Sequence, residues 1–131
     1  MTEFATLPLP AKPDVAAPDG SDVRILLALD GGSMAHFSLD PGAVSIAVRH
    51  KTVEEIWFIT GGKGQMWRSQ DGREEVTDVV ADICLTIPLG TDFQFRSTGS
   101  EPLTAVAITM PPWPGEDEVD FVEGRWPAAV D

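Results

Sequence analysis

The stretch HKTVEEIWFITGGKG, residues 50–64, brings together residue types that can move a proton. It joins His50 and the adjacent carboxylates Glu54 and Glu55 to an apolar run that ends at a pair of glycines. A histidine changes its charge near neutral pH, and a carboxylate beside it fixes its tautomer and poises it as a general acid or base. The stretch therefore predicts a proton-transfer site centred on His50. The alternative is a structural histidine that is satisfied by a hydrogen bond to a glutamate.

Only one of the two glutamates can belong to that site. Glu54 and Glu55 are neighbours in a run that enters a strand, so their side chains point to opposite sides of the sheet. They therefore cannot form the paired carboxylates of a glycosidase.

The surrounding sequence predicts the β-strands that must position these residues. Residues 24–110 break into short runs rich in Val, Ile, Phe, Trp and Thr, with turn signals such as DPG at 40–42 and GG at 61–62. This pattern is typical of an antiparallel sandwich or barrel. In the run 43–50, every second residue forms a mostly apolar face that ends in the histidine. We therefore expect His50 at the mouth of a lined interior.

The two ends of the chain differ from its centre. Residues 1–22 are rich in proline and predict an extended arm, whereas 23–110 predict the barrel. Residues 111–131 are rich in proline and acidic side chains, with Trp113 and Trp126 as apolar anchors. We expect this tail to wrap around the barrel without regular structure.

Size, charge and cysteine content narrow the function classes. The 131 residues fit one domain, and a single cysteine together with an N-terminus unlike a secretion leader favours the reducing cytoplasm. A net charge of -12 repels phosphate backbones, so nucleic acid is not an expected partner. No apolar run approaches the roughly 20 residues of a membrane span, so no membrane is expected either.

One strand predicts a partner subunit. Glu55, Trp57 and Ile59 share one face of their run, but Ile56 and Phe58 on the opposite face are also apolar. A strand covered on both faces in so small a chain needs a second sheet on one side and an arm or a subunit on the other. We therefore expect a homodimer.

Two sets of residues share characteristic intervals along the chain. The first set is Gly42, Val48, His50, Glu55 and Gly62, and the second is Asp82, Pro88, Gly90, Phe93 and Ser97. Their spacing resembles the two motifs of the cupin family, the first of which places a glycine, two histidines separated by one residue, a glutamate and a second glycine at these intervals.

The resemblance covers residues 42–97 and extends with flanking strands to 34–110. The run TMPPWPGEDE at 109–118 is also similar to the ending of small single-domain bacterial cupins of the cupin-2 type. The resemblance implies a double-stranded β-helix, the small jelly-roll barrel, with Gly42, Gly62 and Gly90 at turns.

The resemblance also implies a metal-binding position, at which two of the usual ligands are replaced in this sequence. Cupins typically hold a divalent metal with three histidines and one glutamate, but Val48 and Phe93 stand where two of the histidines belong. Only His50 and Glu55 remain as ligands, with His36 as a possible third, and transition-metal sites usually need at least three protein ligands. We therefore expect no cofactor, and a divalent metal is the disfavoured alternative.

The resemblance to the cupin motifs also implies that the side chains of Val48, Trp57, Phe93 and Phe95 line the barrel interior. These side chains predict either the walls of a small apolar ligand pocket or plain core packing.

Three functions remain open. The first is small-molecule binding, with His50 and Glu55 as the catalytic pair of an isomerase, epimerase or lyase. The second is a binding or dimerisation module without chemistry, and the third is a metal-dependent oxygenase with atypical ligands.

Overall fold

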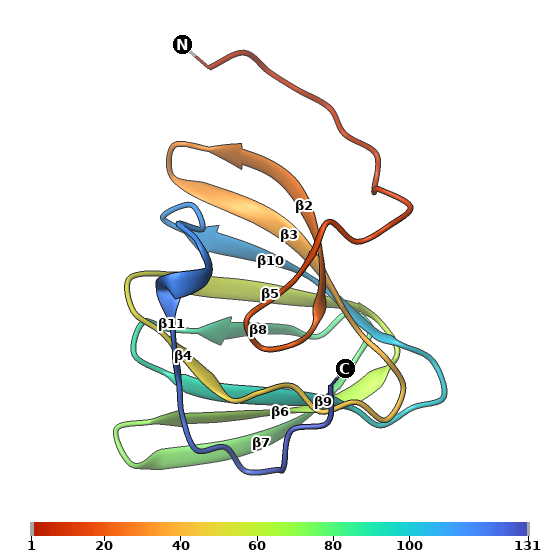
Figure 1. Ribbon diagram of the computed structural model, residues 1–131, viewed down its shortest axis with the longest axis vertical. Helices are drawn as coiled ribbons and strands as arrows, with labels where there is room; N and C mark the ends of the chain where they lie inside the picture. The colour runs from red at the N-terminus through yellow and green to blue at the C-terminus, as the bar shows by residue number, and fades with distance from the viewer. Residues whose placement is uncertain (1, 131) are drawn as a thin grey trace.

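The computed structural model describes residues 2–130 and confirms the all-β prediction (Figure 1). The strands in chain order are β1 (Val15–Ala16), β2 (Asp22–Leu29), β3 (Gly32–Leu39), β4 (Val48–His50), β5 (Glu54–Gly61), β6 (Lys63–Gln70), β7 (Arg73–Val80), β8 (Cys84–Ile87), β9 (Asp92–Ser97), β10 (Leu103–Met110) and β11 (Val119–Phe121). A short 3-10 helix, η1 (Glu116–Glu118), precedes β11. Within residues 2–130 no helix is long and apolar enough to cross a membrane.

Two antiparallel sheets form the barrel. The first has the strand order β1-β2-β3-β10-β5-β8, and the second has the order β11-β4-β9-β6-β7. Strands distant in the sequence are neighbours in both sheets, as when β10 lies between β3 and β5. Figure 1 shows β2, β3, β10, β5 and β8 of the first sheet one below the other, with β6 and β7 of the second sheet at the bottom. The arrangement is the double-stranded β-helix that the motif spacing predicts.

Aromatic side chains join the two sheets across the core. Trp57 of β5 stacks on Phe37 of β3, with ring centroids 5.1 Å apart. It also meets the edges of Phe93 and Phe95 of β9 at 6.2 and 5.1 Å. Trp57, Phe93 and Phe95 are each 2% exposed, so a large part of the barrel interior is filled by their rings.

The three glycines of the motifs lie where the chain needs a left-handed backbone. Gly42, Gly62 and Gly90 have φ angles of +80°, +77° and +83°, which glycine adopts without the steric penalty of a Cβ atom. Gly62 is also crowded, because a Cβ there would meet the carbonyl oxygen of Pro102. The prediction of turns at these positions is confirmed.

The arm and the tail each contribute a short strand, so the prediction of an irregular tail is wrong at β11. In this strand Val119 turns inward and pairs with His50, while Phe121 pairs with Val48 at the open edge of β4. The strand is extended and ends the second sheet, so pairing satisfies backbone groups that an edge would leave free.

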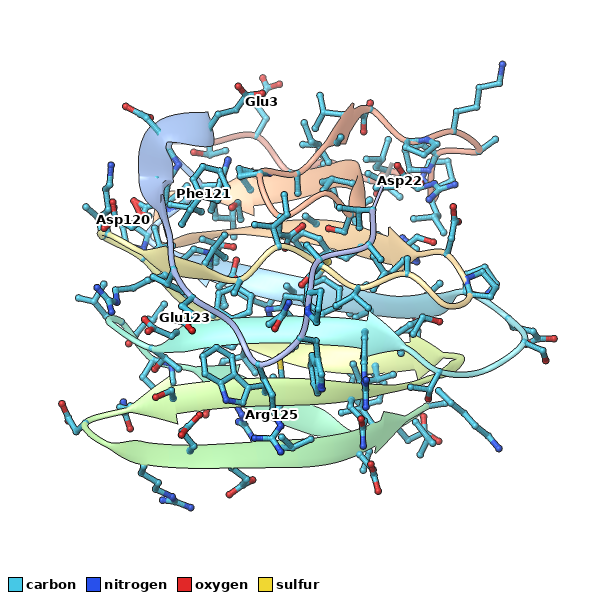
Figure 2. All side chains as sticks on the ribbon, turned by 60° about the horizontal axis from the view of Figure 1, so that its bottom comes forward. Glu3, Asp22, Asp120, Phe121, Glu123 and Arg125 are labelled. Atoms are coloured by element: carbon cyan, nitrogen blue, oxygen red, sulfur yellow. The ribbon has the colours of Figure 1, made fainter. Side chains whose placement is uncertain are left out.

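The rest of the tail crosses the outer surface of the second sheet (Figure 2). Gln94 of β9 is 1% exposed and anchors the tail there through its side-chain amide. The amide donates to the carbonyl oxygens of Ser45 and Trp126 and accepts from the backbone N–H groups of Arg125 and Trp126. The guanidinium of Arg96 also lies 4.2 Å from the ring centroid of Trp126.

The expected run 43–50 is a regular strand only at Val48–His50. Ser45 and Ala47, expected on the outward face, are both buried. The tail lies over them: the carbonyl of Ala47 accepts a hydrogen bond from the N–H of Val122.

Candidate functional site

His50, the last residue of β4, is 5% exposed inside the barrel mouth. Its imidazole meets the ring of Phe93 at 5.1 Å and the ring of Trp113 at 5.6 Å, both nearly perpendicular. Its Nδ1 atom lies 3.9 Å from Oε1 of Glu55. Within residues 2–130 this buried nitrogen has no hydrogen-bond partner. The two predicted proton-transfer residues are therefore adjacent, but no hydrogen bond joins them.

Glu55 faces the interior and Glu54 faces outward, as the motif spacing predicts. Oε1 of Glu55 accepts a hydrogen bond from the indole N–H of Trp57 at 3.0 Å. Oε2 accepts one from the hydroxyl of Thr109 at 2.5 Å, because Thr109 is its cross-strand partner in β10. Two donors from two strands thus fix the carboxylate of Glu55 in the barrel mouth.

A second buried carboxylate, Asp19, comes from the arm. It lies between β1 and β2, is 6% exposed, and accepts two hydrogen bonds from Ser21 on its Oδ1 atom, at 2.9 Å from the backbone N–H and 2.7 Å from the hydroxyl. Burial raises the pKa of Asp19 above its usual range, although the hydrogen bonds from Ser21 oppose this. The charge of Glu55 raises the same pKa further, and His50 lowers it.

Sequence reasoning missed Asp19. The signal was the run PDGSD at 18–22, in which an aspartate precedes Gly-Ser and can accept hydrogen bonds from the following residues in a turn. That pattern predicts the turn but gives no direction for the carboxylate. A contact between distant parts of the chain holds this loop in place, in which the N–H of Ile46 donates to the carbonyl of Asp19 at 2.8 Å.

These three titratable residues line one cavity of about 320 Å³. Its aromatic walls are Phe37, Trp57, Phe93 and Trp113, and its lining includes no lysine or arginine among the described residues. Val48, Trp57 and Phe93 therefore lie where the sequence predicted ligand-binding side chains. Phe95 does not reach the cavity, because it packs deeper in the core against Trp57.

His36 does not join the site. It alternates with Phe37, whose ring lies in the core, so the imidazole of His36 lies on the opposite face of β3. There burial lowers the pKa of His36, and the nearby charge of Arg24 lowers it further.

The donor set does not fit the metal that cupins typically hold. Val48 and Phe93 are cross-strand partners that are 1% and 2% exposed, and their hydrocarbon side chains fill the positions of two ligands. Within residues 2–130 no group of three His, Cys, Asp or Glu side chains could hold a metal ion. His50 and Glu55 alone offer too few donors.

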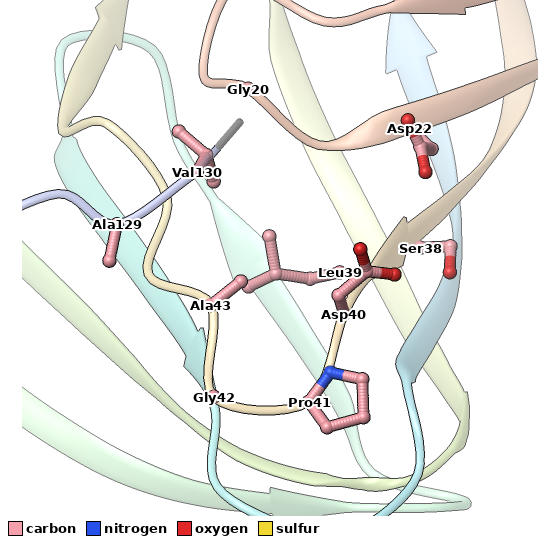
Figure 3. A pocket seen from close by; sticks show the side chains of 10 residues that line it. All are labelled: Gly20, Asp22, Ser38, Leu39, Asp40, Pro41, Gly42, Ala43, Ala129 and Val130. Carbon is pink, nitrogen blue, oxygen red and sulfur yellow. The ribbon is translucent and has the colours of Figure 1, made fainter.

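A second cavity, of about 370 Å³, lies between the arm, the turn after β3 and the end of the tail (Figure 3). Its carboxylates, Asp22 and Asp40, are exposed, and no histidine is among its lining residues. Figure 3 shows the side chain of Val130 beside Gly20, where the tail meets the loop that carries Asp19. The cavity around His50 is the better candidate because it alone of these two encloses buried titratable groups.

Comparison with known proteins supports the fold. No family model and no curated protein matches the chain. A solved structure from Bacillus halodurans is 24% identical with a TM-score of 0.65, covering 79% of this chain and 76% of that one. An uncharacterized conserved protein with a double-stranded β-helix domain from Klebsiella pneumoniae is 15% identical with a TM-score of 0.65, covering 79% and 85%.

An enzyme is among the similar structures. Oxalate decarboxylase from Lactobacillus farciminis, solved as a formate complex, is 18% identical with a TM-score of 0.66. The match covers 72% of this chain and 30% of the decarboxylase chain. Together these likenesses show the double-stranded β-helix fold that the motif spacing predicts.

Proposed function

We propose that the cavity around His50 binds a small organic molecule and that His50 exchanges a proton with it. One observation carries this proposal: a buried imidazole with an unpartnered Nδ1 lies on the wall of a cavity, beside a fixed carboxylate. Buried polar groups are nearly always paired, so an unpaired one beside a cavity needs an explanation. A bound ligand that interacts with the imidazole supplies one.

The geometry suits acid–base chemistry of the isomerase, epimerase or lyase type. Phe93 and Trp113 contact the imidazole nearly perpendicular to its plane, and the carboxylate of Glu55 lies 3.9 Å from its Nδ1 atom. His50 would take a proton from a carbon or oxygen of the ligand and later return it, which needs no oxidant or reductant. The aromatic walls exclude water and so strengthen the electrostatic interaction between ligand and site.

The size of the cavity limits the ligand. About 320 Å³ lies at the lower end of the range for small-molecule sites. This supports a compact metabolite rather than a polymer or a large cofactor.

A binding module without chemistry is the second candidate, and the bonding of Glu55 favours it. Both carboxylate oxygens of Glu55 already accept hydrogen bonds, from Trp57 and Thr109. The distance of 3.9 Å between its Oε1 atom and Nδ1 of His50 is too long for a hydrogen bond. The glutamate would then anchor the barrel mouth, and His50 would contribute only to binding.

A thermal-stabilisation screen with small organic molecules tests the proposal, since a ligand that binds only the folded state raises the melting temperature. We expect stabilising molecules to lose their effect in His50→Ala and to weaken in Glu55→Gln. His36→Ala is the matched control, because this second histidine faces away from the core.

Turnover then separates the two candidates. Loss of turnover in His50→Ala, with binding partly kept in Glu55→Gln, supports the enzyme. Stabilisation of the wild type without turnover supports the binding module. A hit that stabilises wild type and His50→Ala equally would contradict the assignment of the cavity.

We also propose that the protein is a cytoplasmic homodimer. The outer face of the first sheet carries apolar residues that are 37–42% exposed, Met34 of β3 and Ile56 and Phe58 of β5, and Ile108 of β10 is paired between Met34 and Ile56. Such a continuous apolar face supports contact with a second copy of the chain. The exposed free thiol of Cys84 fits a reducing compartment.

A further inference from the structure

We propose that the ligand of this cavity carries a protonated amine, which binds between the carboxylates of Asp19 and Glu55 and against the aromatic walls. This inference rests on the proposed function, since it names the chemical class of the ligand. Two side chains that the sequence did not assign to the site, Asp19 and Trp113, complete the proposed amine site.

The charges around the cavity are one-sided. Asp19 and Glu55 are 6% and 3% exposed, and the lining also includes Glu116 of η1. The lining has no lysine or arginine among the described residues, so His50 is the one side chain there that can carry a positive charge. A ligand cation would compensate carboxylates that the protein leaves without a strong counter-charge.

The unpartnered Nδ1 of His50 is an independent sign that a ligand belongs in this cavity. It lies on the same cavity as the two carboxylates and is itself almost completely buried. The acidic residues alone would not indicate that a ligand binds there. An unpaired imidazole nitrogen beside them indicates a site that a polar ligand completes.

The aromatic walls favour an ammonium over a metal ion. Trp57 and Trp113 line the cavity together with Phe37 and Phe93. Aromatic faces attract organic cations through their quadrupole, and tryptophan does so most strongly. A metal ion would instead require three or more donor side chains, which the described residues do not bring together here.

The charge state of Asp19 should respond to such a ligand. Burial raises its pKa, and the other titratable groups on the cavity are Glu55 of β5, His50 of β4 and Glu116 of η1. An ammonium beside Asp19 favours the carboxylate and so displaces any proton held there. Affinity for an amine should therefore rise with pH until Asp19 is fully ionised.

Three probes with the same ring but different charges test the inference: benzylamine, benzyl alcohol and benzoate. Binding is measured by calorimetry at pH 7 and by the change in tryptophan fluorescence. We expect benzylamine to bind about ten-fold or more tightly than benzyl alcohol, corresponding to about 1.4 kcal/mol, and benzoate to bind most weakly.

Two isosteric variants locate the effect. Asp19→Asn keeps an oxygen to accept the hydrogen bonds of Ser21 but removes the charge, so benzylamine affinity should fall about ten-fold while that of benzyl alcohol stays unchanged. Asp22→Asn removes an equal charge from an exposed residue of the second cavity and should change neither affinity. Thermal unfolding of each variant confirms that it is folded.

The pH dependence of the wild type provides a test that needs no variant. Benzylamine affinity should rise with pH across the titration of Asp19, whereas benzyl alcohol affinity should stay constant. A flat benzylamine profile together with an unchanged Asp19→Asn would overturn the inference.

The outcomes also separate this inference from the proposed function. Equal or tighter binding of benzyl alcohol or benzoate would overturn the amine preference and leave the small-molecule site standing. Absence of binding by all three probes overturns the amine inference. If the stabilisation screen also yields no molecule sensitive to His50→Ala, the proposed function fails with it.

Discussion

Replacement of Gln94 by leucine should detach the tail from the barrel. Its side chain makes four hydrogen bonds: two donated to the carbonyls of Ser45 and Trp126, and two accepted from the N–H groups of Arg125 and Trp126. At about 1 kcal/mol each, their loss would cost about 4 kcal/mol. Burial of the leucine side chain would offset about 1.5 kcal/mol of this loss. We therefore expect the free energy of unfolding to fall by about 2–3 kcal/mol.

Urea unfolding followed by tryptophan fluorescence measures this change. Gln94→Glu is a matched variant that keeps an acceptor oxygen for the N–H groups of Arg125 and Trp126. A protonated carboxyl there can also donate one of the two bonds that leucine loses, so its loss of stability should be smaller than that of Gln94→Leu. Gln70→Leu is the control, because Gln70 is exposed. Amide hydrogen exchange should also accelerate at Arg125 and Trp126 in Gln94→Leu.

The same substitution should affect the candidate site. Val130, near the end of the tail, contacts the loop at Gly20, next to Asp19. A detached tail would release this contact, so benzylamine affinity should fall in Gln94→Leu. A stability loss below about 0.5 kcal/mol, with unchanged exchange in the tail, would refute the assignment of Gln94 as its anchor.

Four further predictions follow from particular residues. The pKa of Asp19 in the folded state lies above its ordinary value of 3.8, so the folded state binds this proton more tightly than the unfolded state does. The free energy of unfolding should therefore fall as pH rises from 3.8 through the folded-state pKa. Urea unfolding at several pH values should show this fall in the wild type and not in Asp19→Asn. Gly20→Ala should cost about 1–3 kcal/mol, because φ is +91° and a Cβ would clash with Val130, and it should cost more than Gly42→Ala, which strains a φ of +80° in open space. Sedimentation should show a dimer for the wild type and a monomer for Phe58→Glu, and a wild-type monomer would contradict the proposed interface. Elemental analysis of protein without a histidine tag should find less than one equivalent of transition metal per chain, and one tightly held equivalent would contradict this.

The sequence was sufficient for the barrel and for one pair in the site. Period-two alternation and the glycine turns act over a few residues, so local patterns predict the fold. The opposite directions of Glu54 and Glu55 follow from the same alternation, and the motif spacing selected the one that faces inward.

The rest of the site depends on contacts between distant parts of the chain. Asp19 and Trp113 reach the cavity from the arm and the tail, whose courses are fixed by pairings such as Ile46 with Asp19 and His50 with Val119. No local period encodes such pairings. The burial of Ser45 likewise depends on the tail that covers it, which the alternation within residues 43–50 does not reveal.

The most direct test of the account is a crystal structure of the protein with a molecule that the stabilisation screen selects. We predict electron density for that molecule between Trp57 and Trp113, within hydrogen-bond distance of His50, Glu55 or Asp19. Density only in the second cavity beside Asp22 and Asp40, or only on the outer surface, would contradict the claim that the barrel mouth is the functional site.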